Sequence, residues 1–341
     1  MRAFANWTWS AVAILCFGIA AFGQDEPPLI NGPILGFVPD ASGAAIQPII
    51  GVLGASVVGP PLLLDSEIRN AVISPKQNYA LATRGDNAEV VLIRLGLDSV
   101  TMTSLDRFRA GADLIAISPS GSAAATYTHD TKVVQSITGL AQAPEAGFGF
   151  NASDIPGRLQ AMAISDDAAL ALLNFTTGND STLWVVNSTG SRWLLPAQHP
   201  SAATFLAGRH DAVIADDAAR EVFLIRGVDQ EASRIPVASF GDGFDRIAGV
   251  AASADGLRIF ITSTKSETIT LVDLETSLST ALPCHCVATG LHPLKGTSVF
   301  RLSNPSDGAV AVLDASSAEP RIIVLPVATA GKAPNPQGVQ Q

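Results

Sequence analysis

A recurring phrase is the feature that most constrains the fold of this 341-residue chain. In each copy, an apolar stretch leads to a turn, and a second apolar stretch, a polar loop and a third apolar stretch follow. Aligned on the turn, the copies fall at Ser74, Ser118, Ser165, Ala207, Ser253 and His292. The spacings are 44, 47, 42, 46 and 39 residues. A repeat of this length sets the architecture before any single motif is considered.

The residue types within each repeat predict short strands joined by turns. Val, Ile, Leu and Thr dominate the apolar segments, and Asp, Gly, Ser and Asn separate them, which is typical of strands and tight turns. The sequence lacks a sustained apolar pattern at i, i+3, i+4 and i+7, so long amphipathic helices are not expected. Four short strands in about 44 residues, repeated along the chain, predict the blades of an all-β propeller.

The number of blades follows from counting pairs of strands. In each repeat, the first two strands form an inner pair and the last two form an outer pair. Residues 32–61 carry a strand–turn–strand pattern with no inner pair before it, so the sequence holds seven outer pairs against six inner pairs. We therefore predict seven four-stranded blades, one of them irregular or closed by the N-terminal segment. Six blades with an extra hairpin is the alternative.

One repeat carries a more specific signature. Residues 247–277 contain a turn of the form S-x-D-G before a strand, and a later strand that ends in Val-Asp. The matching positions are Ser253, Asp255, Gly256, Val272 and Asp273. This segment resembles the YVTN repeat of WD40-like β-propellers, which implies the propeller fold. The resemblance implies no particular function, because propellers serve as enzymes, carriers and scaffolds alike.

The N-terminal residues have the features of an export signal. Arg2 precedes an apolar run at residues 11–22, and small residues at Ala21 and Gly23 predict cleavage before Gln24. A retained anchor helix is the alternative, but the acidic, proline-containing segment that follows argues against it. We expect a secreted or periplasmic protein with a signal peptide at 1–23, one propeller domain at 24–327 and a disordered tail at 328–341.

Composition excludes several classes of partner. The net charge is −10 and only 15% of residues are charged, so no basic patch is available for nucleic acid. After residue 23 no apolar run approaches the ~20 residues of a membrane span, and no membrane insertion is expected once the signal is cleaved. We expect a monomer without a cofactor.

Two cysteines remain after signal cleavage, Cys284 and Cys286, with His292 six residues further on. Three interpretations stay open: a local disulfide, two free thiols, or ligation of a soft metal ion. Residues i and i+2 of an extended segment face the same side, so both sulfurs could meet one ion. No metal site is assigned, but if a metal were bound, Cys284, Cys286 and His292 would be its ligands.

The candidate ligand face lies in two sets of loops, those between successive blades and those between the second and third strands of a blade, because loops on a rigid scaffold commonly carry function. The polar residues predicted there are Arg84, Asp86, Arg107, His129, Asp130, Asp154, His199, Asp216, Arg220, Asp242, Asp245 and Lys265.

Two functions fit this face. The leading hypothesis is a non-enzymatic scaffold that binds a protein or a small polar ligand, and no catalytic residue is assigned. The alternative is a propeller enzyme, a lactonase-like hydrolase or an oxidoreductase, in which His129, Asp130 and His199 converge in the central funnel as acid and base. An enzyme would gather such groups in a deep pocket, whereas a binding module needs only a suitable face.

Overall fold

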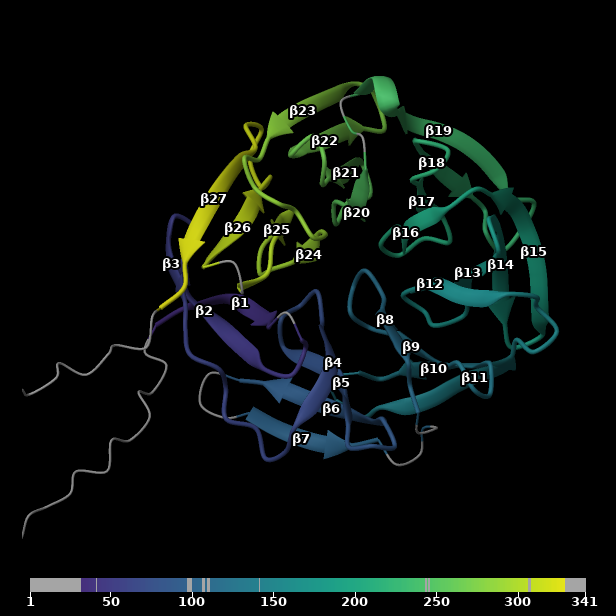
Figure 1. Cartoon of the computed structure of the whole chain (residues 1–341), viewed down its shortest axis with the longest axis horizontal. Coiled ribbons are helices and arrows are strands. Elements are labelled where there is room, and N and C mark those ends of the chain that lie inside the picture. Colours follow the sequence, from purple (N-terminus) through teal and green to yellow (C-terminus); the bar gives the residue numbers. More distant parts are fainter. Residues whose placement is uncertain are drawn as a thin grey trace, which may run out of the picture. The chain divides into compact units, whose positions relative to one another are not determined.

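The computed structural model describes residues 32–328, except 41, 97–99, 106–107, 109–110, 141, 243, 245 and 306–307. These residues form seven antiparallel sheets arranged in a ring (Figure 1), which confirms the prediction of a seven-bladed propeller. The predicted signal peptide and residues 329–341 of the predicted tail lie outside the described residues. In the described part, no helix has the length and apolar character that crossing a membrane requires.

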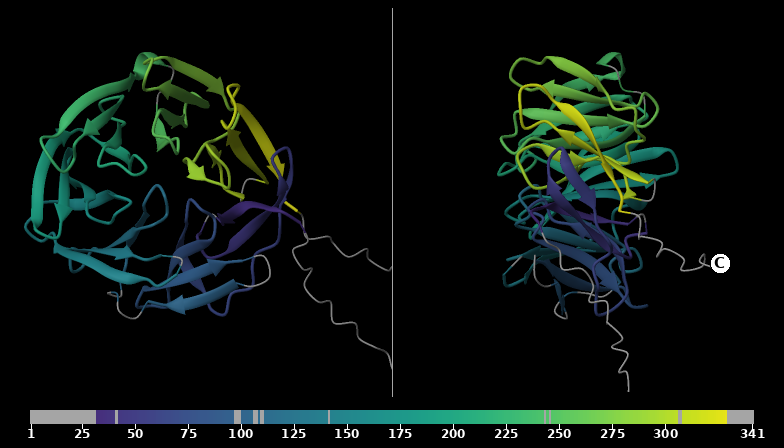
Figure 2. Two further views of the ribbon diagram at one scale, coloured as in Figure 1. Left: turned by 180° about the vertical axis from the view of Figure 1, so that it is seen from behind. Right: turned by 90° about the vertical axis from the view of Figure 1, so that its left-hand side faces the viewer.

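The blades follow one another round the ring in chain order, as the view from behind also shows (Figure 2). Blade 1 has three strands and the other six have four. A short 3₁₀ turn, η1 (Phe240–Asp242), lies between blades 5 and 6. The strands are β1 (Ile34–Pro39), β2 (Ile46–Val52) and β3 (Ala55–Val58) in blade 1; β4 (Ile68–Ile73), β5 (Tyr79–Arg84), β6 (Glu89–Leu95) and β7 (Val100–Ser104) in blade 2; β8 (Leu114–Ile117), β9 (Ala124–Thr128), β10 (Val133–Thr138) and β11 (Glu145–Asn151) in blade 3; β12 (Arg158–Ile164), β13 (Ala171–Thr177), β14 (Asp180–Asn187) and β15 (Gly190–Ala197) in blade 4; β16 (Pro200–Phe205), β17 (Ala212–Asp216), β18 (Glu221–Arg226) and β19 (Ser233–Ser239) in blade 5; β20 (Ile247–Ala252), β21 (Arg258–Ser263), β22 (Thr268–Asp273) and β23 (Ser279–Pro283) in blade 6; and β24 (His292–Pro293), β25 (Val299–Arg301), β26 (Ala309–Asp314) and β27 (Arg321–Pro326) in blade 7.

Packing between blades explains the apolar composition. The second strands are buried on both faces because each blade is covered by its two neighbours, and β5, β13 and β17 each contain at least four buried residues in succession. Such strands are apolar along their length rather than at alternate positions. The low proportion of charged residues in the sequence therefore reflects interfaces between blades.

The repeated serine has a structural role at the turn between the first and second strands. Ser74, Ser118, Ser165 and Ser253 are at most 2% exposed. The Oγ of each accepts a hydrogen bond from the backbone N–H five residues later, at 3.4, 3.1, 3.0 and 2.9 Å respectively. The side chain thus closes the turn and satisfies a buried donor, which explains the serine in the repeat.

The structure corrects the sequence alignment in two blades that lack this serine. The backbone N–H of Ser74, Ser118, Ser165 and Ser253 donates to the carbonyl five residues later, and the residues that do the same in blades 5 and 7 are Leu206 and Leu294. The alignment on Ala207 and His292 was therefore wrong by one and two residues. His292 does not lie at the turn but on β24, the innermost strand of blade 7.

Blade 1 lacks the innermost strand that the other blades have. The burial of β1, with five buried residues followed by a half-buried one, equals that of β5, a second strand. Val58, at the end of β3, forms a parallel bridge with Val327, directly after the outermost strand of blade 7, and its carbonyl accepts from Ala328 N–H at 2.9 Å. β3 therefore runs in the direction of a fourth strand, and β1 and β2 correspond to second and third strands.

Residues from neighbouring blades occupy one end of the position where the innermost strand of blade 1 is missing. Gln77, from the turn between β4 and β5, accepts from Phe37 N–H at 2.6 Å and donates to Pro293 O at 2.6 Å. Lys295 N–H, from the turn between β24 and β25, donates to Leu35 O at 3.0 Å. These contacts give hydrogen-bond partners to the backbone groups of Leu35 and Phe37 on the inner edge of β1, and they join blades 1, 2 and 7.

Candidate functional site

A cavity of about 400 Å³ opens at the other end of the vacant strand position. It lies between blades 1, 2, 3 and 7, where β4 and β8 begin and β25 ends. This is the side of the ring on which the chain passes from one blade to the next. The polar residues of its wall are Asp40, Ser42, Asn70, Asp113, Thr289, His292, Arg301 and Asn304.

The wall of blades 1 and 2 depends on two unusual backbone conformations. The pairing of β4 with β5 skips from Arg69 to Val72, so that Asn70 stands outside the ladder with a φ of 54°. Asparagine tolerates this left-handed conformation better than most residues. Gly43, in the turn between β1 and β2, has a φ of 67°, and a Cβ there would come within 3.0 Å of the Asn70 and Ala71 nitrogens. The glycine therefore allows this turn to approach β4.

The wall of blade 7 carries a neutral imidazole beside a buried cation. His292 and Arg301 are partners in the pairing of β24 with β25. Desolvation lowers the pKa of His292 from 6.5 to about 3, with a further contribution from the positive charge of Arg301. Arg301 is only 3% exposed, and desolvation lowers its pKa to about 10. At neutral pH, the imidazole is therefore uncharged and the guanidinium is charged.

The two carboxylates of the cavity are engaged in local structure. Asp40 accepts from the N–H groups of Ala44 and Ala45 and from the Ser42 hydroxyl, at 2.8, 3.1 and 2.8 Å. Desolvation alone would raise the pKa of Asp40, but these hydrogen bonds lower it. Asp113 accepts from the N–H of His129 at 2.6 Å. Among the described residues, no carboxylate forms an ion pair with Arg301.

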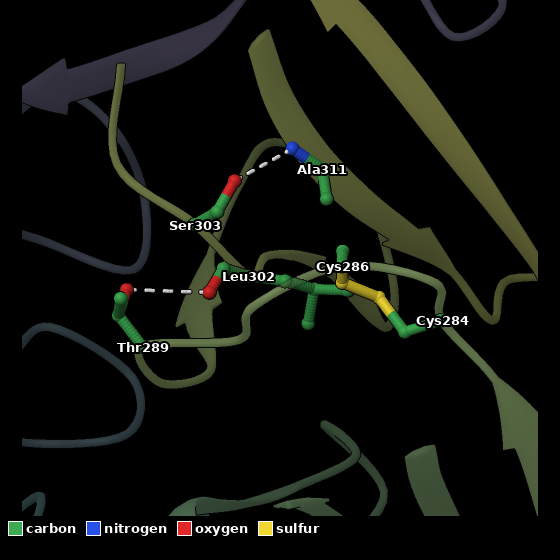
Figure 3. Close-up of a disulfide and its surroundings, with 6 residues drawn as sticks. All are labelled: Cys284, Cys286, Thr289, Leu302, Ser303 and Ala311. Atoms are coloured by element: carbon green, nitrogen blue, oxygen red, sulfur yellow. Dashed lines mark hydrogen bonds between the residues drawn. A yellow bond between two sulfur atoms is a disulfide. The ribbon is translucent and has the colours of Figure 1, made fainter. Parts of the chain in front are cut away.

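Cys284 and Cys286 form a disulfide in the loop that leads to the cavity (Figure 3). Their Cα atoms are 5.0 Å apart, and His285 between them has a φ of 50°. Further along, Thr289 N–H donates to Leu302 O at 2.7 Å, which fixes the loop against blade 7. Because both sulfurs are in the disulfide, they are not thiolate ligands here, and His292 faces the cavity instead. In the described part of the chain, no three metal-binding side chains form a cluster.

The predicted ligand-face residues are spread over several blades, and those that the structure describes do not line this cavity. Several have structural partners. Arg84 pairs with Glu89 at 2.7 Å, and His129 makes an edge-on contact with Tyr127. Asp242 accepts from Ser239 N–H at 2.7 Å, and Arg220 covers the ring of Phe240 at 4.8 Å.

The remaining predicted residues divide into one buried carboxylate and several exposed side chains. Asp216, 2% exposed, accepts from the N–H groups of Gln198, His199 and Ala219. Asp86, Asp130, Asp154, His199 and Lys265 are exposed in their loops. Arg107 and Asp245 lie outside the described residues. The proposed convergence of His129, Asp130 and His199 does not occur in this cavity.

Most residues of the cavity wall were not predicted from the sequence. Asp40, Asn70, Asp113, Arg301 and Asn304 were not singled out, and His292 was considered only as a metal ligand. One signal could have indicated the place: the count of six inner pairs against seven outer pairs indicates that one blade is short of inner strands, and a missing inner strand leaves space on the inner side of the ring.

A second polar cluster lies at the ends of the strands that point away from the cavity side of the ring. His210, in the turn between β16 and β17, contacts Asp229 at 2.9 Å through Nδ1 and Asp167 at 2.8 Å through Nε2. The hydrogen bond to Asp229, then that to Asp167, raises the pKa of His210 above 6.5, and its bond to His210 lowers the pKa of Asp229 below 3.8. The cluster links blades 4 and 5.

This cluster predicts a pH-dependent contribution to stability. Because the folded-state pKa of His210 is raised, its contribution is complete below pH 6.5 and is lost as the pH rises through the raised pKa. Since all three side chains are partly exposed, we expect His210→Gln to lower the free energy of unfolding by only about 1 kcal/mol at pH 5.5, and by less at pH 8.5. Denaturant unfolding at the two pH values, with His199→Gln as control, measures the difference. An equal loss at both pH values would contradict this expectation.

Comparisons with known proteins support the fold. No protein-family model matches the chain, and no curated protein sequence matches it. A functionally unknown protein from Desulfotomaculum acetoxidans DSM 771 is 13% identical with a TM-score of 0.56, over 84% of this chain and 96% of that one. A candidate 6-phosphogluconolactonase from Bacteroides fragilis NCTC 9343 is 12% identical with a TM-score of 0.57, over 89% of this chain and 97% of that one. At such identities, the likeness shows the propeller fold alone.

Proposed function

We propose that this propeller is a non-enzymatic binding protein whose central cavity takes one small polar molecule. The observation that carries the proposal is the absence of the innermost strand from blade 1, which leaves a cavity with a polar wall on the inner side of the ring. A volume of about 400 Å³ lies in the range of small-molecule sites. The hydroxyl of Thr289 and the amides of Asn70 and Asn304 are suited to a ligand rich in hydroxyl groups.

The same geometry disfavours an extended peptide as the ligand. A peptide that replaced the missing strand would need the inner edge of β1 along its whole length. Gln77 already bonds to Phe37 N–H and Lys295 to Leu35 O at one end of that edge. Only the end near Asp40 is open, which suits a compact ligand.

We also propose that the protein is exported and acts outside the cytoplasm. The predicted signal peptide supports this, and a disulfide between Cys284 and Cys286 would persist in an oxidising compartment. Mass spectrometry of the protein recovered from the periplasm or the medium tests the proposal: an N-terminus at Gln24 is expected, and an N-terminus at Met1 would contradict it.

Blocking the cavity tests the proposed function. Thr289 is exposed in the cavity, and its N–H bond to Leu302 O at 2.7 Å does not depend on the side chain, although the longer bond from its hydroxyl to the same carbonyl, at 3.3 Å, would be lost on substitution (Figure 3). We expect Thr289→Trp to fill the cavity and to abolish binding of neutral sugars, polyols and sugar acids, measured by saturation-transfer NMR. Val287→Trp is the control, because Val287 is 62% exposed in the same loop and outside the cavity wall. Equal binding by both variants, or no binding by the native protein, would contradict the proposal.

Hydrolysis is a second candidate function, favoured by the neutral imidazole of His292 next to Arg301. A neutral histidine can accept a proton and an arginine can stabilise an oxyanion. However, desolvation and the nearby charge of Arg301 lower the pKa of His292, which makes its imidazole a weaker general base at neutral pH and favours binding over catalysis. Hydrolysis of gluconolactone above the rate in buffer, lost in His292→Gln, would establish the enzyme instead.

A further inference from the structure

Arg301 is a buried cation without a counter-charge in the described part of the chain. Its Nη1 donates to Ser303 O at 3.0 Å and to the Asn304 side-chain oxygen. No described acceptor lies within hydrogen-bonding distance of its Nε or Nη2 atoms. A buried charge is unfavourable unless it is paired, and among the described residues this guanidinium has no such partner.

Other arginines with ion pairs show the usual arrangement. Arg84 pairs with Glu89 and Arg321 with Asp314, at 2.7 and 3.0 Å, and both arginines are at least one-third exposed. Arg301 is far more buried, and it is the one that lines the cavity. The cavity carboxylates form no ion pair with it: Asp40 accepts bonds within its own turn, and Asp113 accepts from the N–H of His129.

We propose that the cavity selects a small organic anion, a hydroxyl-rich molecule that carries a carboxylate or a phosphate group, and that Arg301 binds this group. The inference rests on the proposed function and adds the class of ligand. The Nε and Nη2 atoms of Arg301, which no described residue engages, match the two oxygens of such an anion. The uncharged His292 and the amides of Asn70 and Asn304 are then available to the hydroxyl groups.

Matched pairs of compounds test the charge requirement. Calorimetry compares gluconate with glucitol and glucose 6-phosphate with glucose, and inorganic phosphate serves as an anion without hydroxyl-bearing carbons. We expect at least one of the two organic anions to bind at least about tenfold more tightly than its neutral partner. The two pairs distinguish a carboxylate from a phosphate as the preferred group.

A substitution beside Arg301 tests the assigned residue. Asn304→Asp has the same shape and places a carboxylate where Arg301 Nη1 already donates. We expect it to raise the melting temperature and to weaken binding of the preferred anion at least about tenfold more than it weakens binding of the neutral partner. Asn187→Asp is the matched control: it adds the same charge in blade 4, where the Asn187 side-chain oxygen accepts from Thr189 and Gly190, and it should leave binding unchanged.

The outcomes separate the inference from the proposed function. If the neutral compounds bound as tightly as the anions, or if Asn304→Asp and Asn187→Asp weakened anion binding equally, the inference would fail and the binding function would stand. If none of the five compounds bound, the inference would fail together with the function. Arg301→Met, checked for folding by circular dichroism, should lose the preference for anions, and Arg301→Lys should keep part of it. A preference that survived Arg301→Met would overturn the assignment.

Discussion

Replacing Gln77 with alanine is expected to lower the free energy of unfolding by about 3 kcal/mol, because a buried backbone N–H of blade 1 and a partly buried carbonyl of blade 7 would lose their partners. Gln77 is 3% exposed and bonds to Phe37 N–H and Pro293 O at 2.6 Å each. No other described side chain supplies these bonds. Denaturant unfolding followed by intrinsic fluorescence measures the loss.

Two further variants calibrate this expectation. Gln77→Glu keeps an acceptor for Phe37 but removes the donor to Pro293, so an intermediate loss is expected. Gln230 is exposed in the turn between β18 and β19, and Gln230→Ala should change stability by less than about 0.5 kcal/mol. If Gln77→Ala were as stable as Gln230→Ala, the account of how blades 1, 2 and 7 are joined would be wrong.

Replacing Asp216 with alanine is expected to cost about 3 kcal/mol of stability, since three backbone N–H groups would lose a charged acceptor. Its carboxylate accepts from Gln198, His199 and Ala219 at 2.7, 2.8 and 3.0 Å. It therefore fixes the connection between blades 4 and 5. The expected result is a lower midpoint of unfolding with unchanged affinity for the ligand of the cavity.

Asp130→Ala is the control for Asp216, because Asp130 occupies the corresponding turn of blade 3 and is exposed. Its removal should change stability by less than about 0.5 kcal/mol. Asp216→Asn keeps one acceptor oxygen and should be intermediate. Weaker ligand binding by folded Asp216→Asn, with unchanged stability, would instead favour the ligand-face role that sequence analysis gave this residue.

The fold was predictable because its cause repeats along the sequence. Each buried turn serine accepts the N–H five residues later, so it recurs with the period of the blades, and the strands between are apolar because neighbours cover both faces. The same reasoning misplaced Ala207 and His292. In those two blades a leucine stands at the turn, where the backbone bond alone closes it, and no side-chain signal marks the position.

The cavity was not predictable in the same way, because it results from a strand that is absent. Asn70, Asp113 and Arg301 come from blades 2, 3 and 7 and share no local motif. Arg301 is distinctive only through its burial beside the vacant position, which depends on how the ring closes. The unequal count of inner and outer strand pairs indicated the irregular blade, but not which polar residues would surround the space.

The imidazole NMR spectrum of the histidines tests the central claim most directly, because His292 lines the cavity and His129 and His199 belong to the predicted loop face. The resonances are assigned by His→Gln variants, and the preferred anion from calorimetry is then added to saturation. We predict a shift of the His292 signals while those of His129 and His199 stay unchanged. A shift of His129 and His199 with His292 unaffected would place the site on the loops and contradict the assignment of the cavity.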